Sequence, residues 1–190
     1  MPRPIIVGLT GYAQSGKDTL ANLLVEKRGY ERRGFADPMR DMLLRINPLV
    51  LGNPTEGMFH PTRLARIVEM HGWEEAKQMD EVRSLLQRLG TEAGRGVLGE
   101  DIWVNALFAK PQTGPLVISD VRFPNEAQKI HDLGGIVIRI IREGVGPVNH
   151  HTSELKNNYH DFVIHNKLDP GYLLEAYVEI FDNWFQKENV

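Results

Sequence analysis

Several residues near the start of the chain have the types and spacing needed to bind phosphate. Gly11 and Gly16 enclose four residues, and Lys17, Asp18 and Thr19 follow directly. Glycine tolerates backbone angles that a Cβ would forbid, so successive N–H groups between the two glycines can turn inward around a phosphate. Lys17 would bring a full positive charge to the outer phosphates, and a nearby hydroxyl could join the shell of a magnesium ion. The pattern therefore predicts a phosphate-binding loop.

The residue directly after Lys17 departs from the general form of this motif, which has Ser or Thr in that place. Here Asp18 follows the lysine, and Thr19 comes next. The spacing Gly-Lys-x-Thr resembles the form seen in the adenylate-kinase-like nucleoside monophosphate kinases, which places the hydroxyl role on Thr19. The alternative is a chance glycine turn in front of an ordinary helix.

The elements around the loop are those that would hold it in place. Residues 5–10 form an apolar run rich in β-branched side chains, which is typical of a buried strand. A helix is expected from Lys17 to about Arg28, because three leucines recur on one of its faces, and Gly29 ends it. The N-terminus of that helix would direct unpaired N–H groups and a positive dipole end at a bound phosphate. Strand, loop and helix thus follow in the order that a phosphate-binding loop requires.

The composition narrows the class of protein. A length of 190 residues favours one domain with a sizeable core. There are 22 Lys and Arg against 25 Asp and Glu, giving a net charge of −3, so direct binding to nucleic acid is not expected. Cysteine is absent, which excludes disulfides, thiolate chemistry and cysteine-ligated zinc. The first strand leaves no room for a signal peptide and no apolar run reaches membrane-spanning length, so we expect a cytoplasmic protein without a membrane partner.

Strands and helices alternate over the remainder of the chain. Further strands are expected at residues 31–36, 116–119, 136–141 and 162–164. Further helices are expected at 37–46, 125–133 and 170–187, the first with Asp37 as N-cap and Pro38 in its first turn. This alternation predicts an α/β fold, a three-layer αβα P-loop NTPase with a five-stranded parallel sheet.

The second and third expected strands are separated by far more chain than a crossover between parallel strands requires. Helices are expected there at 62–70, 81–94 and 100–110, with a Pro- and Gly-rich loop at 47–61 and a flexible glycine-rich stretch at 94–99. The apolar spacing of the helix at 37–46 directs Met39, Met42, Leu43 and Ile46 inward. We interpret residues 37–110 as a helical acceptor-binding insertion in a single domain whose core is residues 1–36 and 111–190.

Four blocks of this sequence resemble the phage-type deoxynucleoside monophosphate kinases, within the adenylate-kinase-like P-loop kinases. The blocks are Gly11–Thr19, Phe35–Pro38 with Arg40, Leu86–Glu92 with Arg95, and Asp120–Glu126. A weaker fifth block, Asp161–Asn166, resembles the last strand and base-side loop of several small-molecule kinases. The first block is shared with the whole superfamily, so the Asp-x-Arg-Phe-Pro-Asn-Glu block discriminates better. Together the blocks span most of the chain.

This resemblance implies an enzyme that transfers the γ-phosphoryl group of ATP to a deoxynucleoside monophosphate, with Mg²⁺ as cofactor. Such an enzyme supplies precursors for DNA synthesis in the cytoplasm, which is that of the host if the chain is phage-encoded. The residues implied for ATP are Gly11, Ala13, Gln14, Ser15, Gly16, Lys17, Asp18, Thr19 and Asn166. Those implied for the acceptor are Phe35, Asp37, Arg40, Gln87, Thr91, Arg95, Arg122 and Glu154. Thr19 and Asp120 would hold the metal, and Lys17, Asp120, Arg122 and Arg142 would serve catalysis.

Several of these residues have a second interpretation. Asp120 could hold magnesium through water or cap the turn that follows its strand. Arg122 could direct its planar fork at a phosphate or form a surface ion pair with Glu126. Gln87 could recognise the edge of the acceptor base or lie exposed on its helix. Arg40 could bind the acceptor phosphate or be a solvated helix arginine.

A short lid is expected at about residues 142–157, where glycines punctuate the chain. Arg139 and Arg142 both precede those glycines, and Arg142, at the strand's end, is the better choice for neutralising charge on the transferred group. His150 and His151 have no third ligand at a suitable spacing, so a zinc site is not expected. The resemblance instead makes His151 and Glu154 lid or helix-start residues.

Two other functions compete with this interpretation. One is a kinase of another small phosphorylated acceptor, such as dephospho-coenzyme A or phosphomevalonate. The other is a non-catalytic switch that binds ATP, against which the insertion argues, because a switch has no use for an acceptor lobe. The accepted bases, the discrimination of deoxyribose from ribose, and dimerisation are left open by the sequence.

Overall fold

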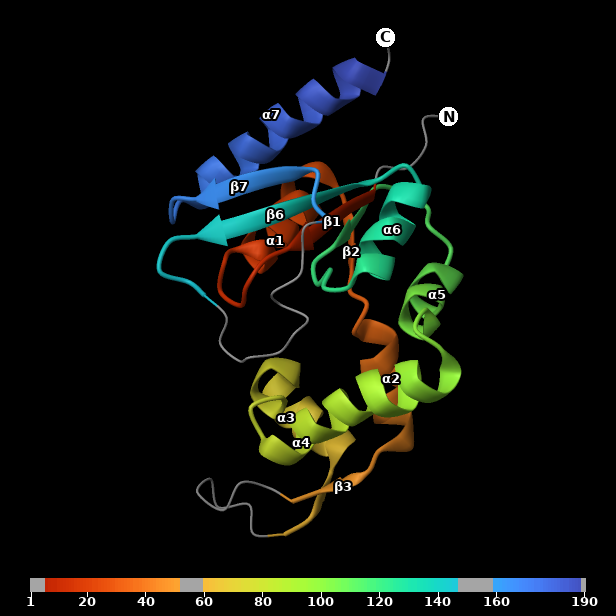
Figure 1. Ribbon diagram of the computed structural model, residues 1–190. Helices are drawn as coiled ribbons and strands as arrows, with labels where there is room; N and C mark the ends of the chain where they lie inside the picture. Colours follow the sequence, from red (N-terminus) through yellow and green to blue (C-terminus); the bar gives the residue numbers. More distant parts are fainter. Residues whose placement is uncertain (1–5, 52–59, 147–158, 189–190) are drawn as a thin grey trace. The chain divides into compact units, whose positions relative to one another are not determined.

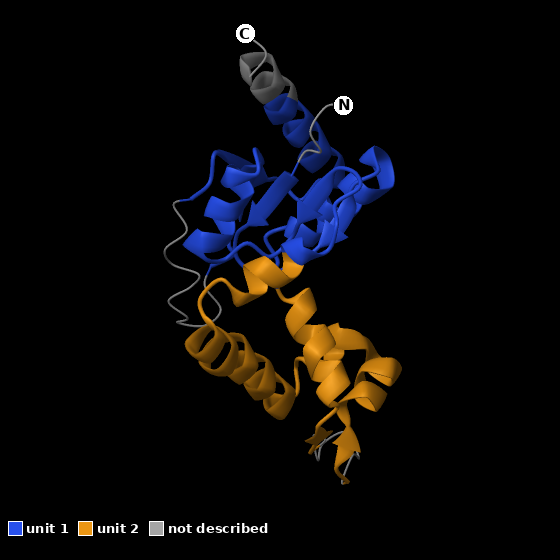
Figure 2. Cartoon of the chain, turned by 90° about the vertical axis from the view of Figure 1, so that its right-hand side faces the viewer, with its two compact units in different colours: residues 1–35, 108–190 blue, residues 36–107 orange. Residues whose placement is uncertain are grey.

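The computed structural model describes residues 6–51, 60–146 and 159–188. The chain folds into two compact units (Figure 2). The first comprises residues 1–35 and 108–190, and the second comprises residues 36–107. In the described residues, no helix combines the length and the apolar character needed to cross a membrane.

The first unit is built on a parallel sheet of five strands in the order β2-β5-β1-β6-β7 (Figure 1). The strands are β1 (Ile6–Thr10), β2 (Glu31–Arg33), β5 (Leu116–Ile118), β6 (Ile136–Arg142) and β7 (Phe162–Asn166). Every neighbouring pair is parallel. All residues of the central strand β1 are buried, as its continuous apolar run predicts for a sheet covered on both faces. The predicted five-stranded parallel sheet is confirmed.

Three helices cover this sheet: α1 (Lys17–Arg28), α6 (Pro124–Asp132) and α7 (Pro170–Glu188). Val7 and Leu9 of β1 belong to the cluster that contains Leu20 of α1 and Leu173 of α7. Gly8 faces the other way, where a Cβ would lie 2.7 Å from Ile130 of α6. Because alternate strand residues point to opposite faces, α1 and α7 cover one face and α6 covers the other. The αβα layering is therefore confirmed.

The second unit is mainly helical. Its elements are α2 (Asp37–Ile46), β3 (Leu49–Val50), β4 (Thr62–Arg63), α3 (Leu64–Ala76), α4 (Asp80–Gln87), a π-helix (Arg88–Leu98) and α5 (Ile102–Ala109). Its core gathers Leu43, Val50, Leu64, Ile67, Ala76, Met79 and Val82. Short helices on a small hydrophobic cluster thus form a folding unit with its own core.

The predicted apolar face of α2 is wrong in part. Leu43 is 3% exposed, but Met42 is 37% and Ile46 is 60% exposed. A helix of 10 residues that packs along one side buries a narrow stripe, so apolar residues beside that stripe stay outside. The N-cap is Ala36, with Asp37 already inside the helix, so the predicted capping by Asp37 is also wrong.

The stretch predicted as a loop at 47–61 contains a strand. β3 pairs antiparallel with β4, which occupies the first two residues of the helix predicted at 62–70. The helix itself begins at Leu64 and reaches Ala76, with non-helical backbone angles at Gly72. Strands of two residues leave almost no periodic signal, so the sequence pattern could not show this hairpin.

The glycine-rich stretch predicted to be flexible at 94–99 is helical up to Leu98. The indole of Trp103 donates to the carbonyl oxygen of Gly90 at 2.9 Å. A Cβ on Gly94 would lie 2.5 Å from the ring of Trp103. Gly94 therefore serves close packing against an aromatic ring.

Glu31 fastens strand β2 to the segment that follows α5. Its carboxylate accepts two hydrogen bonds of 2.9 Å from the guanidinium of Arg33 and one of 3.1 Å from Lys110. Arg33 is 6% exposed and also donates to the carbonyl oxygens of Lys110 and Pro111. Hydrogen bonds from Arg33 lower the pKa of Glu31 from 4.5 to about 2.

We predict that Glu31→Gln lowers the free energy of unfolding by about 1 kcal/mol at pH 7, because a half-exposed charge-assisted network contributes that order. The folded-state pKa lies below that of the unfolded chain, so the contribution of the carboxylate is present above about pH 4.5 and is lost toward about pH 2. Urea unfolding from pH 7 to pH 3 should show the difference between wild type and variant shrinking in acid. Glu69→Gln, which breaks an exposed pair with Arg66, is the control. A difference that is constant with pH would contradict this account.

Candidate active site

The loop between β1 and α1 depends on two glycines with positive φ. Gly11 has φ 139° and Gly16 has φ 110°, and Gln14 between them also has a positive φ of 64°. A Cβ on Gly11 would lie 2.3 Å from the carbonyl oxygen of Ile140, and one on Gly16 would lie 2.5 Å from the amide nitrogen of Asn166. Both the backbone angles and the lack of space therefore require glycine at these two positions.

The hydroxyl of Ser15 lies inside this loop. Ser15 is 1% exposed, and its Oγ has no hydrogen-bond partner among the residues that the structure describes. Leaving a buried hydroxyl without a partner is unfavourable, so the loop is suited to a ligand oxygen that would supply one. The first turn of α1 likewise has no side-chain cap at its N-terminus.

Lys17 lies along the same loop. Its ammonium group donates to the carbonyl oxygens of Gly11 at 2.8 Å and Tyr12 at 2.6 Å. These bonds hold the positive charge beside the loop backbone, close to the N-terminus of α1, whose dipole also favours an anion. Lys17 thus lies against the glycine loop, and its role toward phosphate stays a prediction.

A cavity of about 330 Å³ opens beside the loop. It is lined by Gln14, Gly16, Asp18, Thr19, Arg142, Asn166, Leu168, Pro170 and Leu173. Asn166 donates its side-chain amide to the carbonyl oxygen of Ser15 at 2.8 Å, and Arg142 donates to that of Gln14 at 3.1 Å. The structure therefore brings together residues of the loop, of the end of β6 and of the end of β7.

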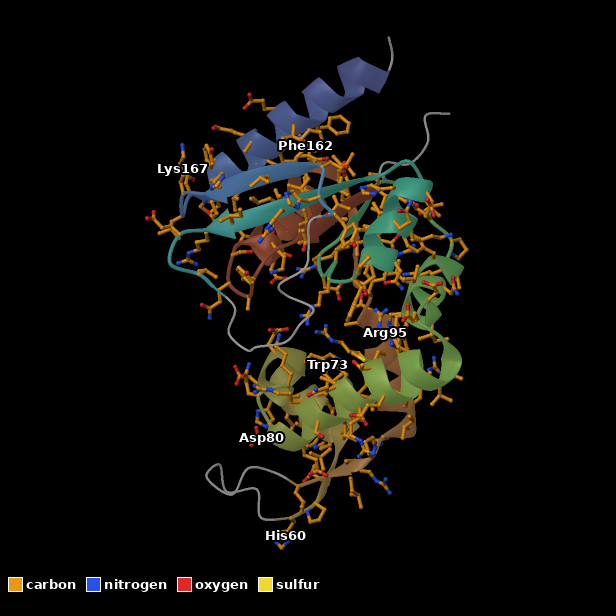
Figure 3. The ribbon with its side chains drawn as sticks, viewed as in Figure 1. His60, Trp73, Asp80, Arg95, Phe162 and Lys167 are labelled. Atoms are coloured by element: carbon orange, nitrogen blue, oxygen red, sulfur yellow. The ribbon has the colours of Figure 1, made fainter. Side chains whose placement is uncertain are left out.

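Three lining residues were not predicted from the sequence. Leu168, Pro170 and Leu173 follow β7 and give one side of the cavity an apolar surface. Lys167, which Figure 3 labels, directly follows β7. Its ammonium lies 4.4 Å from the ring centre of Tyr172. The sequence signal that could have found them is the position of this turn directly after the last strand of a parallel sheet, where ligands bind.

The carboxylate of Asp120 stabilises the turn that follows β2. Its Oδ1 accepts the backbone N–H of Phe35 at 2.7 Å. A Cβ on Gly34 would lie 2.9 Å from the carboxylate, so the glycine allows this close approach. Phe35 itself is 4% exposed and packs edge-to-face with Phe108. This use of Asp120 is neither of the two that the sequence suggested, and its magnesium role stays a prediction.

Glu126 holds the turn that carries Arg122. The carboxylate of Glu126 is 2% exposed and accepts the backbone N–H groups of Arg122 at 2.7 Å and Phe123 at 3.0 Å. It therefore caps the start of α6. The contact between Arg122 and Glu126 runs through the backbone of the arginine, and the side chain of Arg122 is exposed.

The remaining acceptor residues that were predicted and are described belong to the second unit. The guanidinium of Arg40 lies 5.7 Å from the ring of Trp73 and 3.8 Å from the carboxylate of Asp37. Gln87 ends α4, Thr91 lies in the π-helix, and both are exposed. Arg95, which Figure 3 labels, donates to the carbonyl oxygen of Glu100 at 2.8 Å. A π-helix among such residues is a frequent feature of functional sites.

Part of the prediction lies outside the described residues. This applies to Glu154, to the paired residues His150 and His151, and to the lid from position 147 onward. Arg142, the first residue of the predicted lid, ends β6 and is described.

Comparison with known proteins gives a consistent result. The family model of deoxynucleotide monophosphate kinase matches residues 58–173. A deoxynucleotide monophosphate kinase relative from Acanthamoeba polyphaga mimivirus is 28% identical over 188 residues, covering 86% of this chain and 89% of that protein. The deoxynucleoside-5'-monophosphate kinase of Escherichia phage T5 is 26% identical over 194 residues, covering 72% and 78%.

Solved structures of small-molecule kinases also align with the chain. Dephospho-CoA kinase from Campylobacter jejuni has a TM-score of 0.43 at 16% identity, covering 97% of this chain and 98% of that one. Shikimate kinase from Aquifex aeolicus has a TM-score of 0.44 at 12% identity, covering 94% and 97%. The family model spans more than half of this sequence, and the chain belongs to the deoxynucleotide monophosphate kinase family.

Proposed function

We propose that the protein transfers the γ-phosphoryl group of magnesium-ATP to a deoxynucleoside monophosphate, with ATP on the loop of the first unit. The observation that carries this proposal is the buried hydroxyl of Ser15, which lacks a partner among the described residues and lies in a loop with positive φ at Gly11, Gln14 and Gly16. Phosphate oxygens would satisfy that hydroxyl together with the N–H groups of the loop. Family membership supports the same reaction.

The donor phosphates would lie along Gly11 to Thr19, with Ala13 and Gln14 contributing backbone N–H groups and Ser15 its hydroxyl, since the N–H of Ser15 donates to the carbonyl oxygen of Tyr12 at 3.2 Å. Lys17 would offset the charge of the outer phosphates once they draw it away from the loop carbonyls. Mg²⁺ usually keeps several waters and takes one or two protein ligands beside phosphate oxygens. The hydroxyl of Thr19, which lines the cavity, and the carboxylate of Asp120 are our proposed ligands. When bound, the metal offsets charge that spreads over the transferred group.

The base of ATP would lie against the residues that follow β7. Leu168, Pro170 and Leu173 offer an apolar surface on the cavity wall, and aromatic bases bind such surfaces. Asn166 would act by holding the loop, since its amide donates to Ser15 and its side-chain oxygen accepts the N–H of Leu168 at 2.9 Å. The side chain of Asn166 thereby links the phosphate end of the proposed donor site, at Ser15, to its base end, at Leu168.

The second unit would hold the acceptor. We propose that its residues Asp37, Arg40, Gln87, Thr91 and Arg95 take part, with Arg122 and Glu154 from the rest of the chain. Arginine suits the acceptor phosphate because its planar fork can donate two parallel hydrogen bonds. Phe35 is 4% exposed, so we do not expect its ring to touch the nucleotide. A lid at about 142–157 that includes Arg142 would exclude water during transfer.

The test is a coupled assay for ADP formation. The protein is supplied with ATP, Mg²⁺ and each deoxy- and ribonucleoside monophosphate in turn, with dephospho-coenzyme A and phosphomevalonate as rival acceptors. Turnover with one or more deoxynucleoside monophosphates and none with the rivals is the expected result. Turnover with a rival acceptor alone, or ATP binding without any transfer, would overturn the proposal.

We predict that Lys17→Ala lowers kcat/KM by about 10²- to 10³-fold, because it removes the charge that acts on the transferring phosphates. Lys27→Ala, in the last turn of the same helix, is the matched control and should keep normal rates. Thermal unfolding should stay cooperative in both variants, with any loss of stability in Lys17→Ala confined to its two hydrogen bonds with the loop carbonyls. Normal turnover in Lys17→Ala would remove this loop from the donor site.

We predict that Arg122→Lys raises KM for the deoxynucleotide about tenfold and leaves KM for ATP nearly unchanged, because an ammonium cannot replace the bidentate fork. If the contact tightens during transfer, kcat falls as well. Steady-state kinetics with each substrate varied in turn gives the answer. Arg28→Lys, in the last turn of α1, is the control. An effect on ATP alone would move Arg122 to the donor site.

A further inference from the structure

Asp18 places a negative charge beside the proposed binding site of the ATP phosphates. It follows Lys17 directly, lies in the first turn of α1 and lines the donor cavity. Its side chain is 75% exposed. A carboxylate beside the phosphates of ATP would repel them and would weaken the attraction of the helix N-terminus for an anion.

Arg32 of β2 engages this carboxylate. Its Nη2 donates to Oδ1 of Asp18 in an ion pair. Its Nη1 donates to the side-chain oxygen of Asn22 at 2.7 Å, and its Nε donates to the hydroxyl of Ser119 at 3.2 Å. All three nitrogens of one guanidinium therefore have partners, on α1 and directly after β5.

The local structure explains why these residues meet. Asp18 and Asn22 are four residues apart, so they lie on the same face of α1. Alternate residues of a strand point to opposite faces, so Arg32 faces α1 while Arg33 turns to Lys110 and Pro111. Ser119 is 9% exposed, and its N–H bonds to the carbonyl oxygen of Arg33 at 3.2 Å. The guanidinium is thus held from three sides.

We propose that Arg32 is a positioning residue of the donor site, which holds the Asp18 carboxylate in an ion pair so that its charge does not oppose bound ATP. The inference rests on the proposed donor role of the glycine loop. Arg32 acts here through Asp18 and needs no contact with the nucleotide. The departure from the usual Ser or Thr after Lys17 is therefore accompanied by a compensating cation on β2, the strand that follows α1.

The experiment measures ATP affinity by calorimetry at fixed Mg²⁺ and without acceptor, so that it does not depend on turnover. Arg32→Met should weaken ATP binding roughly tenfold at low salt, because it leaves a unit charge uncompensated near the phosphates. Higher salt should reduce this loss, since screening weakens interactions between exposed charges. A merely structural defect would not respond to salt in this way.

Two double variants distinguish the effect of the local ion pair on ATP binding from the effect of the protein's net charge. Arg32→Met with Asp18→Asn should bind ATP within about twofold of wild type, because the opposing charge is gone as well. Arg32→Met with Glu26→Gln makes the same change in net charge on the same helix but keeps Asp18, and it should stay weak. Recovery in both double variants, or in neither, would overturn the proposal.

Thermal unfolding will show whether Arg32→Met folds. If it does not, the single variant Asp18→Asn tests the proposal instead. Without the carboxylate, the positive charge of Arg32 is no longer paired and attracts the phosphates of ATP. ATP should therefore bind several-fold tighter at low salt. Weaker binding in Asp18→Asn would overturn the inference. A different result would show that the glycine loop does not bind ATP at all. In that case the wild-type protein and Lys17→Ala would bind ATP equally.

Discussion

The turn between β1 and α1 depends on two positions where a Cβ does not fit. The atoms that would meet it belong to Ile140 of β6 and Asn166 of β7, so the loop is shaped by strands far along the chain. With glycine at both positions the backbone can pass close to these strands, and the hydroxyl of Ser15 is enclosed in the turn. The cavity beside the loop, Lys17 and the N-terminus of α1, which has no side-chain cap, all lie next to this close approach.

Strand β2 serves two purposes with neighbouring arginines. Arg32 faces the start of α1 and neutralises a carboxylate there, while Arg33 fastens the segment that follows α5. The alternation of side chains along a strand makes this division possible within three residues. One short edge strand therefore contacts both the first turn of α1, through Arg32, and the segment after α5, through Arg33.

In the segment from Asp120 to Glu126, two carboxylates accept hydrogen bonds from backbone N–H groups. Asp120 accepts the N–H of Phe35, and Glu126 accepts the N–H groups of Arg122 and Phe123. The main chain around Arg122 is thus held on both sides, while the guanidinium remains exposed. A fixed backbone lowers the conformational entropy that a side chain loses on binding a ligand, so this arrangement would favour the phosphate contact that we propose for Arg122.

The sequence by itself determined the local elements and the family. The bounds of α1 and the five-stranded parallel sheet follow from apolar periodicity and glycine placement, which act over a few residues. The same local signals missed the β3–β4 hairpin and placed Ile46 inside, because two-residue strands and the edge of a buried stripe leave little pattern.

Only the tertiary structure decided which side chains meet. Asn166 donates to Ser15 across 151 positions, Asp120 holds Phe35, and Arg32 pairs with Asp18. These contacts follow from the strand order β2-β5-β1-β6-β7, which places distant segments side by side. That order results from packing both faces of the sheet at once, and no spacing within a single segment of sequence encodes it.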